Sequence, residues 1–365
     1  MTPPVCINGK FALQRITGVQ RVAHEIVRAL DALPAADGWT LLCPPGAVLP
    51  RFERIRVRTV GPAGWPLHAW EQVVLPWAAR RGLLVNLAGG APALARWQIA
   101  VIHDAAVFDH PEAYTPAFVR WYSALFRHLV RRGDTLMTVS AFSQQRLAAA
   151  LGVPPVRFGR LPLGADHMRH TAPDLRMLEA HGLLRTPYVL AVGSANPTKN
   201  LAALVRAWAR LPAGAQRLVI AGGRHGAVFA DTPGADPAGV LRLGAVDDAA
   251  LVALYRHAQV LVFPSVYEGF GLPPLEAMAV GCPVLAARAA SLPEVCGDAV
   301  AYLSGLDDMA IAADLQRLLA DAGLRDRLRA AGPAQAARWT WAAAAEALVA
   351  QVSAVRAAQA RIGPA

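Results

Sequence analysis

The sequence predicts an α/β protein with two domains, each built on a doubly wound parallel sheet. Three observations lead to this prediction. The chain has 365 residues, whereas a single domain usually has about 150. Short apolar runs rich in β-branched residues alternate with amphipathic segments of helix length in both halves. Because such alternation forms right-handed βαβ units, it implies parallel sheets covered by helices.

The predicted elements follow one another in a regular order. The first half begins with a turn at Gly18 that leads into an amphipathic helix. The second half has helix patterns at 200–211 and 247–258, and Asp247 or Asp248 suits the N-cap of the latter. The predicted strands are LLVNL, QIAVIHD and TLMTVS in the first half and YVLAVG, RLVIAGG, QVLVFPS and CPVLAA in the second.

The domain boundary is expected in residues 157–168, RFGRLPLGADHM, which change from a strand pattern to a turn with proline and glycine. This hinge predicts an N-terminal domain of residues 1–167 and a C-terminal domain of residues 168–344. In open α/β sheets, ligands bind beyond the carboxyl ends of the strands. The loops that follow IHD, AVG and FPS are therefore expected to converge on a cleft between the domains.

The composition is that of a folded globular protein, with 55% apolar and 17% charged residues. The formal charge of +10 is uneven, because residues 1–165 carry +9 and residues 166–365 carry +1. A basic first half is compatible with nucleic-acid binding, with docking on anionic lipid headgroups, or with a pyrophosphate-linked acceptor. Charge alone does not choose among these partners.

The compartment is predicted from the N-terminus and the cysteines. The first residues lack the basic and then apolar pattern of a secretion signal, and we expect a cytoplasmic protein without a transmembrane helix. The four cysteines have no CxxC spacing, and we interpret them as reduced packing residues: Cys6, Cys43, Cys282 and Cys296.

Two carboxylates stand in the apolar stretch 267–281, YEGFGLPPLEAMAVG. Because charged side chains are rarely buried unless they are paired or used, Glu268 and Glu276 are expected to face a cleft. The glycine-rich loop 269–271 leads into a helix with prolines at 273–274, and such a turn offers backbone N–H groups to a phosphate. Glu276 is then close enough to bind a hydroxyl pair such as a ribose. The alternative is that Glu276 caps a helix or forms a salt bridge on it, and that Glu268 is solvated.

The loop VGSANPTKN contains Lys199, one of only two lysines in a chain whose other cationic side chains are arginines. A compact ammonium group at the carboxyl edge of a sheet is a good point charge for a phosphate. The alternative is an exposed loop lysine. The neighbouring glycine-rich loop favours the phosphate-binding interpretation.

His103 and Asp104 follow another predicted strand, where a histidine can orient a substrate hydroxyl or transfer a proton. A structural histidine is the alternative. Walker A, GxSxG and HExxH motifs are absent, as is a GxGxxG after the first strand, which disfavours ATPases, hydrolases and dehydrogenases. No DxD-type carboxylate pair is found, and we predict neither a metal nor a cofactor.

Residues 265–303, SVYEGFGLPPLEAMAVGCPVLAARAASLPEVCGDAVAYL, resemble the signature of the retaining nucleotide-sugar glycosyltransferases of family four. Similar motifs are TGVQRVAHEIVRAL, VIHDAAVFDHPEAY, LPLGAD and VGSANPTKN. The resemblance implies the GT-B architecture, in which two Rossmann-like domains face each other across a cleft. It also implies that the final helix, at about 345–365, packs back on the first domain.

The resemblance implies a role for each matched residue. Lys199 and the backbone of residues 270–272 would bind the donor diphosphate, while Gly18 would let the N-terminal loop close over it. Glu276 would bind the ribose, Glu268 the transferred sugar near the reacting carbon, and His103 a sugar hydroxyl. The implied catalytic residues are His103, Glu268 and Lys199. The implied donor-binding set is Gly18, Gly193, Ser194, Lys199, Asn200, Val246, Gly269, Phe270, Gly271, Leu272 and Glu276.

One departure concerns the diphosphate. Many family members have an arginine after the strand-end glycine or before the lysine, and this chain has Ser194 and Thr198 at those places. Arg224 and Arg288 are candidates for the missing cation. A donor with different phosphate placement is the alternative.

The predicted function is transfer of a hexosyl group from a nucleoside-diphosphate sugar, with GDP-mannose as the best candidate. The acceptor is a glycan or a polyprenyl-pyrophosphate-linked sugar in polysaccharide synthesis. Retention is expected through front-face attack with the leaving phosphate as base, and Glu268 as a transient nucleophile is the alternative. The competing functions are a catalytically silent nucleotide-sugar-binding subunit, a sugar-nucleotide 2-epimerase on the same fold, and a nucleic-acid-binding protein. The last of these would need a basic, aromatic surface for reading nucleic acid rather than a cleft with a glycine-rich loop and a single lysine.

The basic first half is expected to hold the acceptor and to contact the membrane surface. Trp65, Trp70 and Trp77 precede Arg80 and Arg81, a combination typical of an interfacial patch. The alternative is that this segment is an ordinary helix packed in the first domain.

Overall fold

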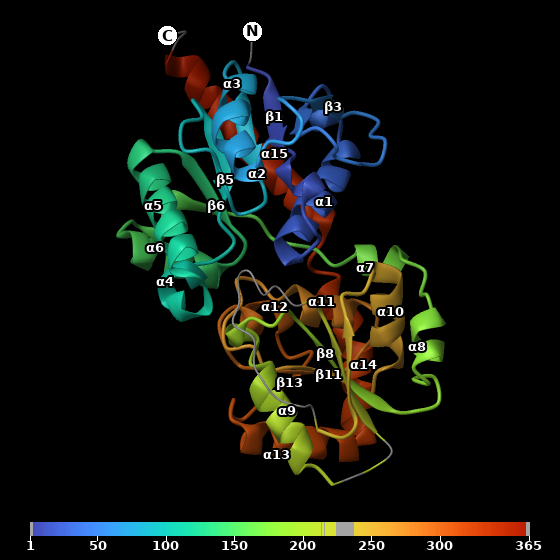
Figure 1. The fold of residues 1–365 in the computed structure, drawn as a ribbon. Helices are drawn as coiled ribbons and strands as arrows, with labels where there is room; N and C mark the ends of the chain where they lie inside the picture. Colours follow the sequence, from blue (N-terminus) through green and yellow to red (C-terminus); the bar gives the residue numbers. More distant parts are fainter. Residues whose placement is uncertain (1–2, 213, 215, 224–236, 363–365) are drawn as a thin grey trace. The chain divides into compact units, whose positions relative to one another are not determined.

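The computed structural model describes residues 3–212, 214, 216–223 and 237–362 (Figure 1). The chain divides into two compact units. Unit 1 consists of Met1–Phe108, Phe118–Leu163 and Thr340–Ala365, and unit 2 consists of Asp109–Ala117 and Gly164–Trp339. Unit 2 thus includes a short segment from the first half of the chain, and unit 1 includes the C-terminal helix.

Unit 1 contains a parallel sheet of seven strands in the order β3-β2-β1-β4-β5-β6-β7. Its strands are β1 (Val5–Asn8), β2 (Thr40–Cys43), β3 (Arg56–Thr59), β4 (Leu83–Asn86), β5 (Gln98–Val101), β6 (Thr135–Thr138) and β7 (Phe158–Arg160). The three strands predicted for this half are β4, β5 and β6. All four residues of β4 and of β5 are buried, which explains why these central strands are apolar apart from Asn86 and Gln98.

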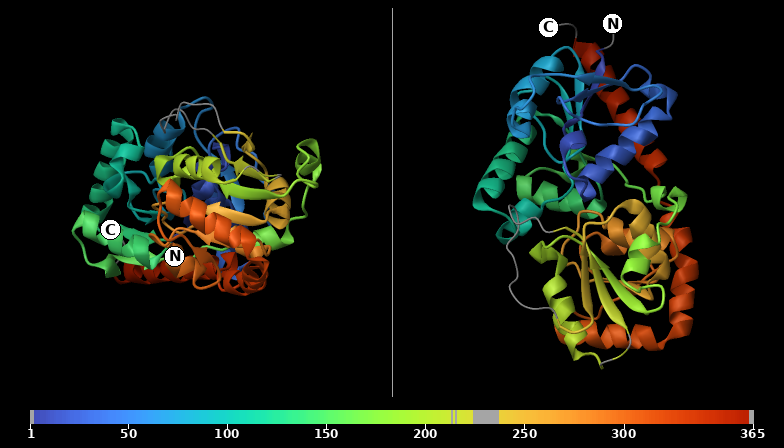
Figure 2. Two further views of the ribbon diagram at one scale, coloured as in Figure 1. Left: turned by 90° about the horizontal axis from the view of Figure 1, so that it is seen from below. Right: turned by 45° about the vertical axis from the view of Figure 1, so that its right-hand side comes forward.

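Helices cover the sheet of unit 1 on both faces (Figures 1 and 2). They are α1 (Gly18–Asp31), α2 (Leu67–Ala69), α3 (Leu75–Ala78), α4 (Ala106–Asp109), α5 (Pro116–Arg132), α6 (Ala141–Leu151) and α15 (Trp341–Ile362). A π-helix, Trp70–Val74, joins α2 to α3. The C-terminal α15 packs against α1, so both ends of the described chain contribute to this unit.

Unit 2 contains a parallel sheet of six strands in the order β10-β9-β8-β11-β12-β13. Its strands are β8 (Tyr188–Val192), β9 (Arg217–Ala221), β10 (Val240–Gly244), β11 (Val260–Phe263), β12 (Val284–Ala286) and β13 (Ala301–Tyr302). All four strands predicted for this half are present. Two parallel sheets with helices confirm the predicted α/β fold class.

The helices of unit 2 follow the predicted alternation. They are α7 (His167–His170), α8 (Arg176–Ala180), α9 (Leu201–Arg210), α10 (Asp248–His257), α11 (Leu272–Ala279), α12 (Leu292–Cys296), α13 (Asp308–Ala320) and α14 (Ala322–Ala336). Asp247 rather than Asp248 caps α10, because its carboxylate accepts a hydrogen bond of 2.8 Å from the backbone N–H of Ala250.

The core of unit 2 lies between its sheet and α9, α13 and α14, and separate apolar clusters fill unit 1. All four cysteines are buried and free, and burial raises the pKa of Cys43, Cys282 and Cys296 to about 12. Such thiols act as small apolar residues. Among the described residues, none of the helices combines the length and the apolar character needed to cross a membrane.

Candidate functional site

The loop that carries Lys199 is hydrogen-bonded to the loop that follows β11. β8 and β11 are neighbouring parallel strands, so their carboxyl ends lie at the same edge of the sheet. The carbonyl oxygen of Thr198 accepts hydrogen bonds from the backbone N–H of Val266, at 2.8 Å, and from the hydroxyl of Ser265, at 3.0 Å. These two bonds bring the predicted phosphate-binding loop beside the carboxylate-bearing loop.

Lys199 and Glu268 form an ion pair at this edge. Lys199 Nζ lies 2.6 Å from Glu268 Oε1, and the two side chains are 22% and 10% exposed. The ammonium group also lies 5.9 Å from the centroid of the Phe263 ring. Glu268 is therefore tolerated in an apolar segment because a cation neutralises it, and the alternative of a solvated Glu268 is wrong.

Ser291 holds the backbone of the glycine-rich loop, a role that the sequence reasoning missed. Its fully buried hydroxyl lies 3.0 Å from the carbonyl oxygen of Glu268 and 2.9 Å from that of Phe270. Gly271 has a φ of 102°, and a Cβ added there would lie 2.6 Å from a methyl group of Leu292. The loop thus needs glycine at this position, both for its backbone conformation and for space.

The N-terminus of α11 offers few hydrogen-bond donors. The helix begins at Leu272, and its next two residues are Pro273 and Pro274, as the sequence predicts for the first turn. The first N–H groups of a helix have no partner inside the helix, and proline has no N–H group. The backbone N–H groups of Gly271 and Leu272 are therefore the donors that this helix end can direct at an anion.

Glu276 is buried on α11, with 4% of its surface exposed. The hydroxyl of Tyr255, on α10, donates a hydrogen bond of 3.3 Å to Oε2. On the other side, His167 Nε2 lies 3.7 Å from Oε1. Glu276 does not cap a helix, because its carboxylate faces polar groups of two other helices. The contact with His167 agrees with the alternative in which Glu276 forms a salt bridge. Neither Tyr255 nor His167 was identified from the sequence, since Tyr255 lies in an apolar helix pattern and His167 in the predicted turn at 157–168.

Two other predicted donor-binding residues serve the local fold. Gly193 directly follows β8 and lies against Gly222. A Cβ added to Gly222 would lie 1.9 Å from the carbonyl oxygen of Gly193. Asn200 has a left-handed φ of 55° and donates its amide to the carbonyl oxygen of Leu306 at 2.9 Å. The Asn200 side chain thus fixes the start of α9. This structural role was not part of the donor-binding function expected for it.

The remaining predicted residues of unit 2 lie in loops at strand ends. Ser194 is half-buried just after β8, and Val246 is half-buried between β10 and α10. Arg288, a candidate for the missing cation, is exposed after β12, and its guanidinium lies 4.2 Å from the centroid of the Tyr302 ring. Arg224, the other candidate, lies outside the described residues.

His103 belongs to unit 1, where it follows β5. Its Nε2 lies 2.8 Å from the carbonyl oxygen of Leu87. A carbonyl only accepts, so Nε2 carries the proton and Nδ1 is the acceptor in the neutral ring. Burial lowers the pKa of His103, which outweighs the opposing effects of Leu87 and Asp104. The neutral ring can thus accept a hydrogen bond from a hydroxyl.

The residues near His103 are small or cap the start of a helix. Gly89 has a φ of 75°, and a Cβ added there would lie 3.6 Å from the His103 ring and 3.7 Å from Val19. The Asp104 carboxylate accepts from the backbone N–H of Ala106 at 2.8 Å, so it caps α4. Gly18 is the first residue of α1, and an added Cβ there would meet no atom within 4 Å.

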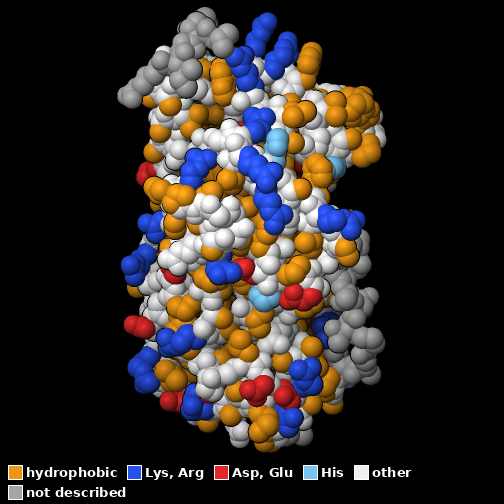
Figure 3. Space-filling model, turned by 90° about the vertical axis from the view of Figure 1, so that its left-hand side faces the viewer, with side chains coloured by type: hydrophobic (Ala, Val, Ile, Leu, Met, Phe, Trp, Pro, Cys, Tyr) orange, Lys and Arg blue, Asp and Glu red, His pale blue; other side chains and the backbone are white. Residues whose placement is uncertain are grey.

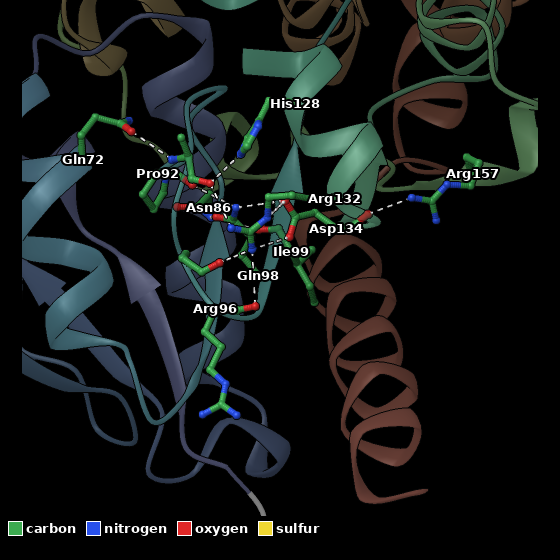
Figure 4. Close-up of polar contacts among 12 residues, drawn as sticks. Gln72, Asn86, Pro92, Arg96, Gln98, Ile99, His128, Arg132, Asp134 and Arg157 are labelled. Carbon is green, nitrogen blue, oxygen red and sulfur yellow. Dashed lines mark hydrogen bonds and ion pairs between the residues drawn. The ribbon is translucent and has the colours of Figure 1, made fainter. Parts of the chain in front are cut away.

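A buried polar network holds the loop between β4 and β5, which carries Leu87 and Gly89 (Figure 4). Asn86 donates to Gln98 Oε1 at 3.1 Å, and Gln98 donates to Asp134 Oδ2 at 3.3 Å. Arg132 lies 3.2 Å from the same Asp134 oxygen and bonds to carbonyl oxygens of the loop. The network holds this loop and thereby indirectly fixes the Leu87 carbonyl group, which is the hydrogen-bond partner of His103.

No cluster of three or more potential metal ligands is present in the described part of the chain.

Comparison with known sequences identifies relatives of this site. The sequence model of the family "Glycosyl transferases group 1" matches residues 179–335. The chain is 32% identical to O-antigen chain mannosyltransferase B of Escherichia coli over 253 residues, which cover 67% of the chain and 66% of that protein. It is 29% identical over 259 residues to the serotype-specific mannosyltransferase WbdA of the same species, which cover 67% of the chain and 32% of WbdA.

A further relative and two solved structures match nearly the whole chain. The D-inositol 3-phosphate glycosyltransferase of Nocardia farcinica is 30% identical over 356 residues, which cover 91% of the chain and 75% of that protein. Sucrose-phosphate synthase from Thermosynechococcus elongatus superposes with a TM-score of 0.73 at 21% identity, covering 98% of the chain and all (100%) of that structure. HepE of Anabaena, solved with UDP and glucose, superposes with a TM-score of 0.71 at 16% identity, covering 97% and 100%.

These structural likenesses show the fold, which is the GT-B fold of glycosyltransferases. The predicted GT-B fold class is thereby confirmed. The sequence likeness shows more, because it extends over both units and includes the segment with Lys199, Glu268 and Glu276. The chain therefore belongs to the glycosyl transferases group 1.

Proposed function

We propose that the chain transfers a mannosyl group from GDP-mannose, with retention of anomeric configuration, to a glycan or polyprenyl-pyrophosphate-linked acceptor. The observation that carries this proposal is the arrangement of Lys199, the N-terminus of α11 and Glu276 around one sheet edge. The mannosyltransferases among the relatives support the choice of sugar. Because the matches cover about two thirds of one such relative and about one third of the other, the substrates are part of the proposal.

The donor binds to unit 2 in this proposal. The ammonium of Lys199 and the N–H groups of Gly271 and Leu272 contact the diphosphate, and Glu276 accepts hydrogen bonds from the ribose. Val246 contacts the base. Such preorganised donors stabilise the negative charge that develops on a leaving diphosphate, which is usually the largest contribution to catalysis at such a site. Gly193, Ser194 and Gly269 complete the donor site, and Gly18 lets the N-terminal loop approach the phosphates.

The proposed reaction replaces one bond at the anomeric carbon. The bond from this carbon to the diphosphate oxygen breaks, and a bond to the acceptor oxygen forms on the same face. The acceptor proton passes to the departing phosphate, so the products are the glycoside and GDP. Glu268 contacts the sugar, and its pairing with Lys199 makes it a weaker nucleophile, which favours front-face attack over a covalent intermediate. His103 accepts a hydrogen bond from a sugar hydroxyl through Nδ1, and no step uses a metal.

The experiment that tests this proposal combines binding and turnover. Calorimetry with GDP, UDP, dTDP and ADP on the wild type, Lys199→Ala and Glu276→Gln is expected to show GDP as the tightest ligand. Each substitution is expected to weaken it about tenfold or more, because each removes a charged partner. Release of GDP from GDP-mannose with a lipid-linked glycan then measures turnover. Binding without turnover on any acceptor favours a silent subunit, and unchanged binding in both variants refutes the donor site.

We further propose that unit 1 contacts the cytoplasmic face of an anionic membrane, which brings a lipid-linked acceptor to the enzyme. The contact is the Trp77 surface, defined by Val73, Trp77, Arg58 and Arg80. Val73 and Trp77 are 58% and 67% exposed. They line an apolar groove of about 410 Å³ together with Val60, Gly61 and Val74. An exposed tryptophan beside such a groove is typical of the membrane interface.

The charges around the Trp77 surface suit an anionic partner. The Arg80 guanidinium stacks 4.5 Å from the Trp77 ring, and Arg58 bonds to a backbone carbonyl of α3 at 3.3 Å. Within residues 56–82 the only acid is Glu71, which is buried and lies 2.7 Å from Lys10. On the face of unit 1 drawn in Figure 3, basic and apolar side chains mix and acidic ones are few. Trp70 does not belong to this surface, because it is 1% exposed and its indole donates to the carbonyl oxygen of Val60.

Sedimentation with vesicles tests this contact. The wild type is expected to sediment with vesicles that contain phosphatidylglycerol and to remain in solution with pure phosphatidylcholine, because anionic lipid attracts each basic side chain. Trp77→Ser with Arg80→Ser is expected to abolish sedimentation. Trp121→Ser, at a 38% exposed tryptophan on α5, is the control. Equal sedimentation of the double variant and the control refutes the Trp77 surface.

A further inference from the structure

His167 lies on the first short helix of unit 2 after the chain leaves unit 1 at Leu163. It is 9% exposed, and its α7 packs against α11, the helix that carries Glu276. His170, at the other end of α7, is exposed. A buried histidine beside a buried carboxylate is costly unless the two groups interact, because each must give up water.

Each carboxylate oxygen of Glu276 has a different polar side chain beside it. His167 Nε2 lies 3.7 Å from Oε1, which is within ion-pair range, and the Tyr255 hydroxyl donates to Oε2 at 3.3 Å. An ionised carboxylate has about four lone-pair positions. It can therefore accept from the Tyr255 hydroxyl and from both hydroxyls of a ribose at the same time, while the imidazole lies beside Oε1.

We propose that His167 is a positioning residue that orients Glu276 for the ribose 2′- and 3′-hydroxyls of the nucleotide. It touches no substrate atom, and it acts through the ion-pair contact of its imidazole with the carboxylate, in which Nε2 lies 3.7 Å from Oε1. This inference rests on the proposed function of Glu276. It goes further, because it assigns the discrimination of ribonucleotides to a residue of α7 that does not touch the nucleotide.

The proposal predicts an effect on the ribose contact alone. Removing the imidazole is expected to weaken binding of GDP and to leave binding of 2′,3′-dideoxy-GDP unchanged, because the latter has no hydroxyls for Glu276. A purely structural role of His167 has a different signature, since a distorted α11 weakens both nucleotides equally.

Calorimetric titration of GDP and 2′,3′-dideoxy-GDP tests this on the wild type, His167→Leu, His167→Gln and the control His170→Gln. The wild type is expected to prefer GDP, and His167→Leu is expected to lose about tenfold of this preference, because the substitution removes the ion-pair partner of a buried carboxylate. His167→Gln keeps an N–H donor and is expected to retain most of the preference. His170→Gln is expected to match the wild type.

Each outcome has a defined meaning. Equal weakening of both nucleotides in His167→Leu, or no weakening of either, overturns the positioning role while the donor site stands. Failure of the wild type to bind any nucleoside diphosphate overturns the proposed function and this inference with it. If His167→Leu loses cooperative thermal unfolding, His167→Met provides an apolar side chain of similar volume for the same titrations.

Discussion

Lys199 and Glu268, which are 69 residues apart in sequence, form an ion pair of 2.6 Å at the carboxyl edge of the unit 2 sheet. The carboxylate thus contacts the ammonium group that we propose binds the donor diphosphate. An ammonium group has three donors and can contact both groups at once. The pair therefore fixes the position of Lys199 at this edge.

The first prediction concerns the stability of this pair. Lys199→Met leaves the Glu268 carboxylate without its cation, and the free energy of unfolding is expected to fall by about 1.5–3 kcal/mol. The double variant with Glu268→Gln is expected to recover part of this loss, because no unpaired charge remains. Urea denaturation of the four proteins in the cycle measures the coupling. Additive effects of the two substitutions contradict a stabilising pair.

The second prediction concerns Ser291, whose hydroxyl bonds to the loop backbone at Glu268 and Phe270. Ser291→Ala is expected to cost about 1 kcal/mol of stability and to weaken nucleotide binding, because the loop loses its buried anchor. Ser123→Ala, at a buried serine of α5, is the control. Thermal unfolding and calorimetry with GDP check the two effects. A Ser291→Ala variant with wild-type affinity excludes a role for this anchor in the donor site.

The third prediction concerns pH and His103, whose pKa is lowered by burial. In the unfolded chain this histidine binds a proton near pH 6.5, whereas in the folded chain its lowered pKa keeps it neutral there. The free energy of unfolding therefore falls as the pH drops below about 6.5. His103→Gln removes this contribution, and its stability is expected to decline less steeply over that range. Urea denaturation between pH 7.5 and 5 compares the two proteins. Parallel pH profiles show that His103 titrates alike in both states.

The fourth prediction concerns Gly222 at the end of β9. A Cβ there would lie 1.9 Å from the carbonyl oxygen of Gly193, and backbone atoms cannot move aside easily. Gly222→Ala is expected to destabilise the fold by more than about 3 kcal/mol. Gly133→Ala, with a φ of 77° and no atom within 4 Å of the added Cβ, is expected to cost only about 1–2 kcal/mol. Similar unfolding midpoints for the two variants contradict the close packing of β8 and β9.

The elements that the sequence predicted best are those with a strong local pattern. The central strands β4, β5, β8 and β11 were found because they are buried on both faces and consist almost entirely of apolar residues. The edge strand β3, RVRT, escaped prediction because all its residues are exposed and two are arginines. Its strand state depends on pairing with β2, which no local pattern reveals.

The residue types of the candidate site could be predicted from the sequence, because an ammonium group, two carboxylates and a glycine-rich helix start each leave a short local motif. Their edge of the sheet was predictable as well, since loops after parallel strands share one edge. The pairing of these groups became known from the folded structure. Lys199 meets Glu268, and Glu276 meets Tyr255 and His167, through contacts between residues far apart in the chain. Such contacts depend on helix packing and side-chain burial, which a linear motif does not encode.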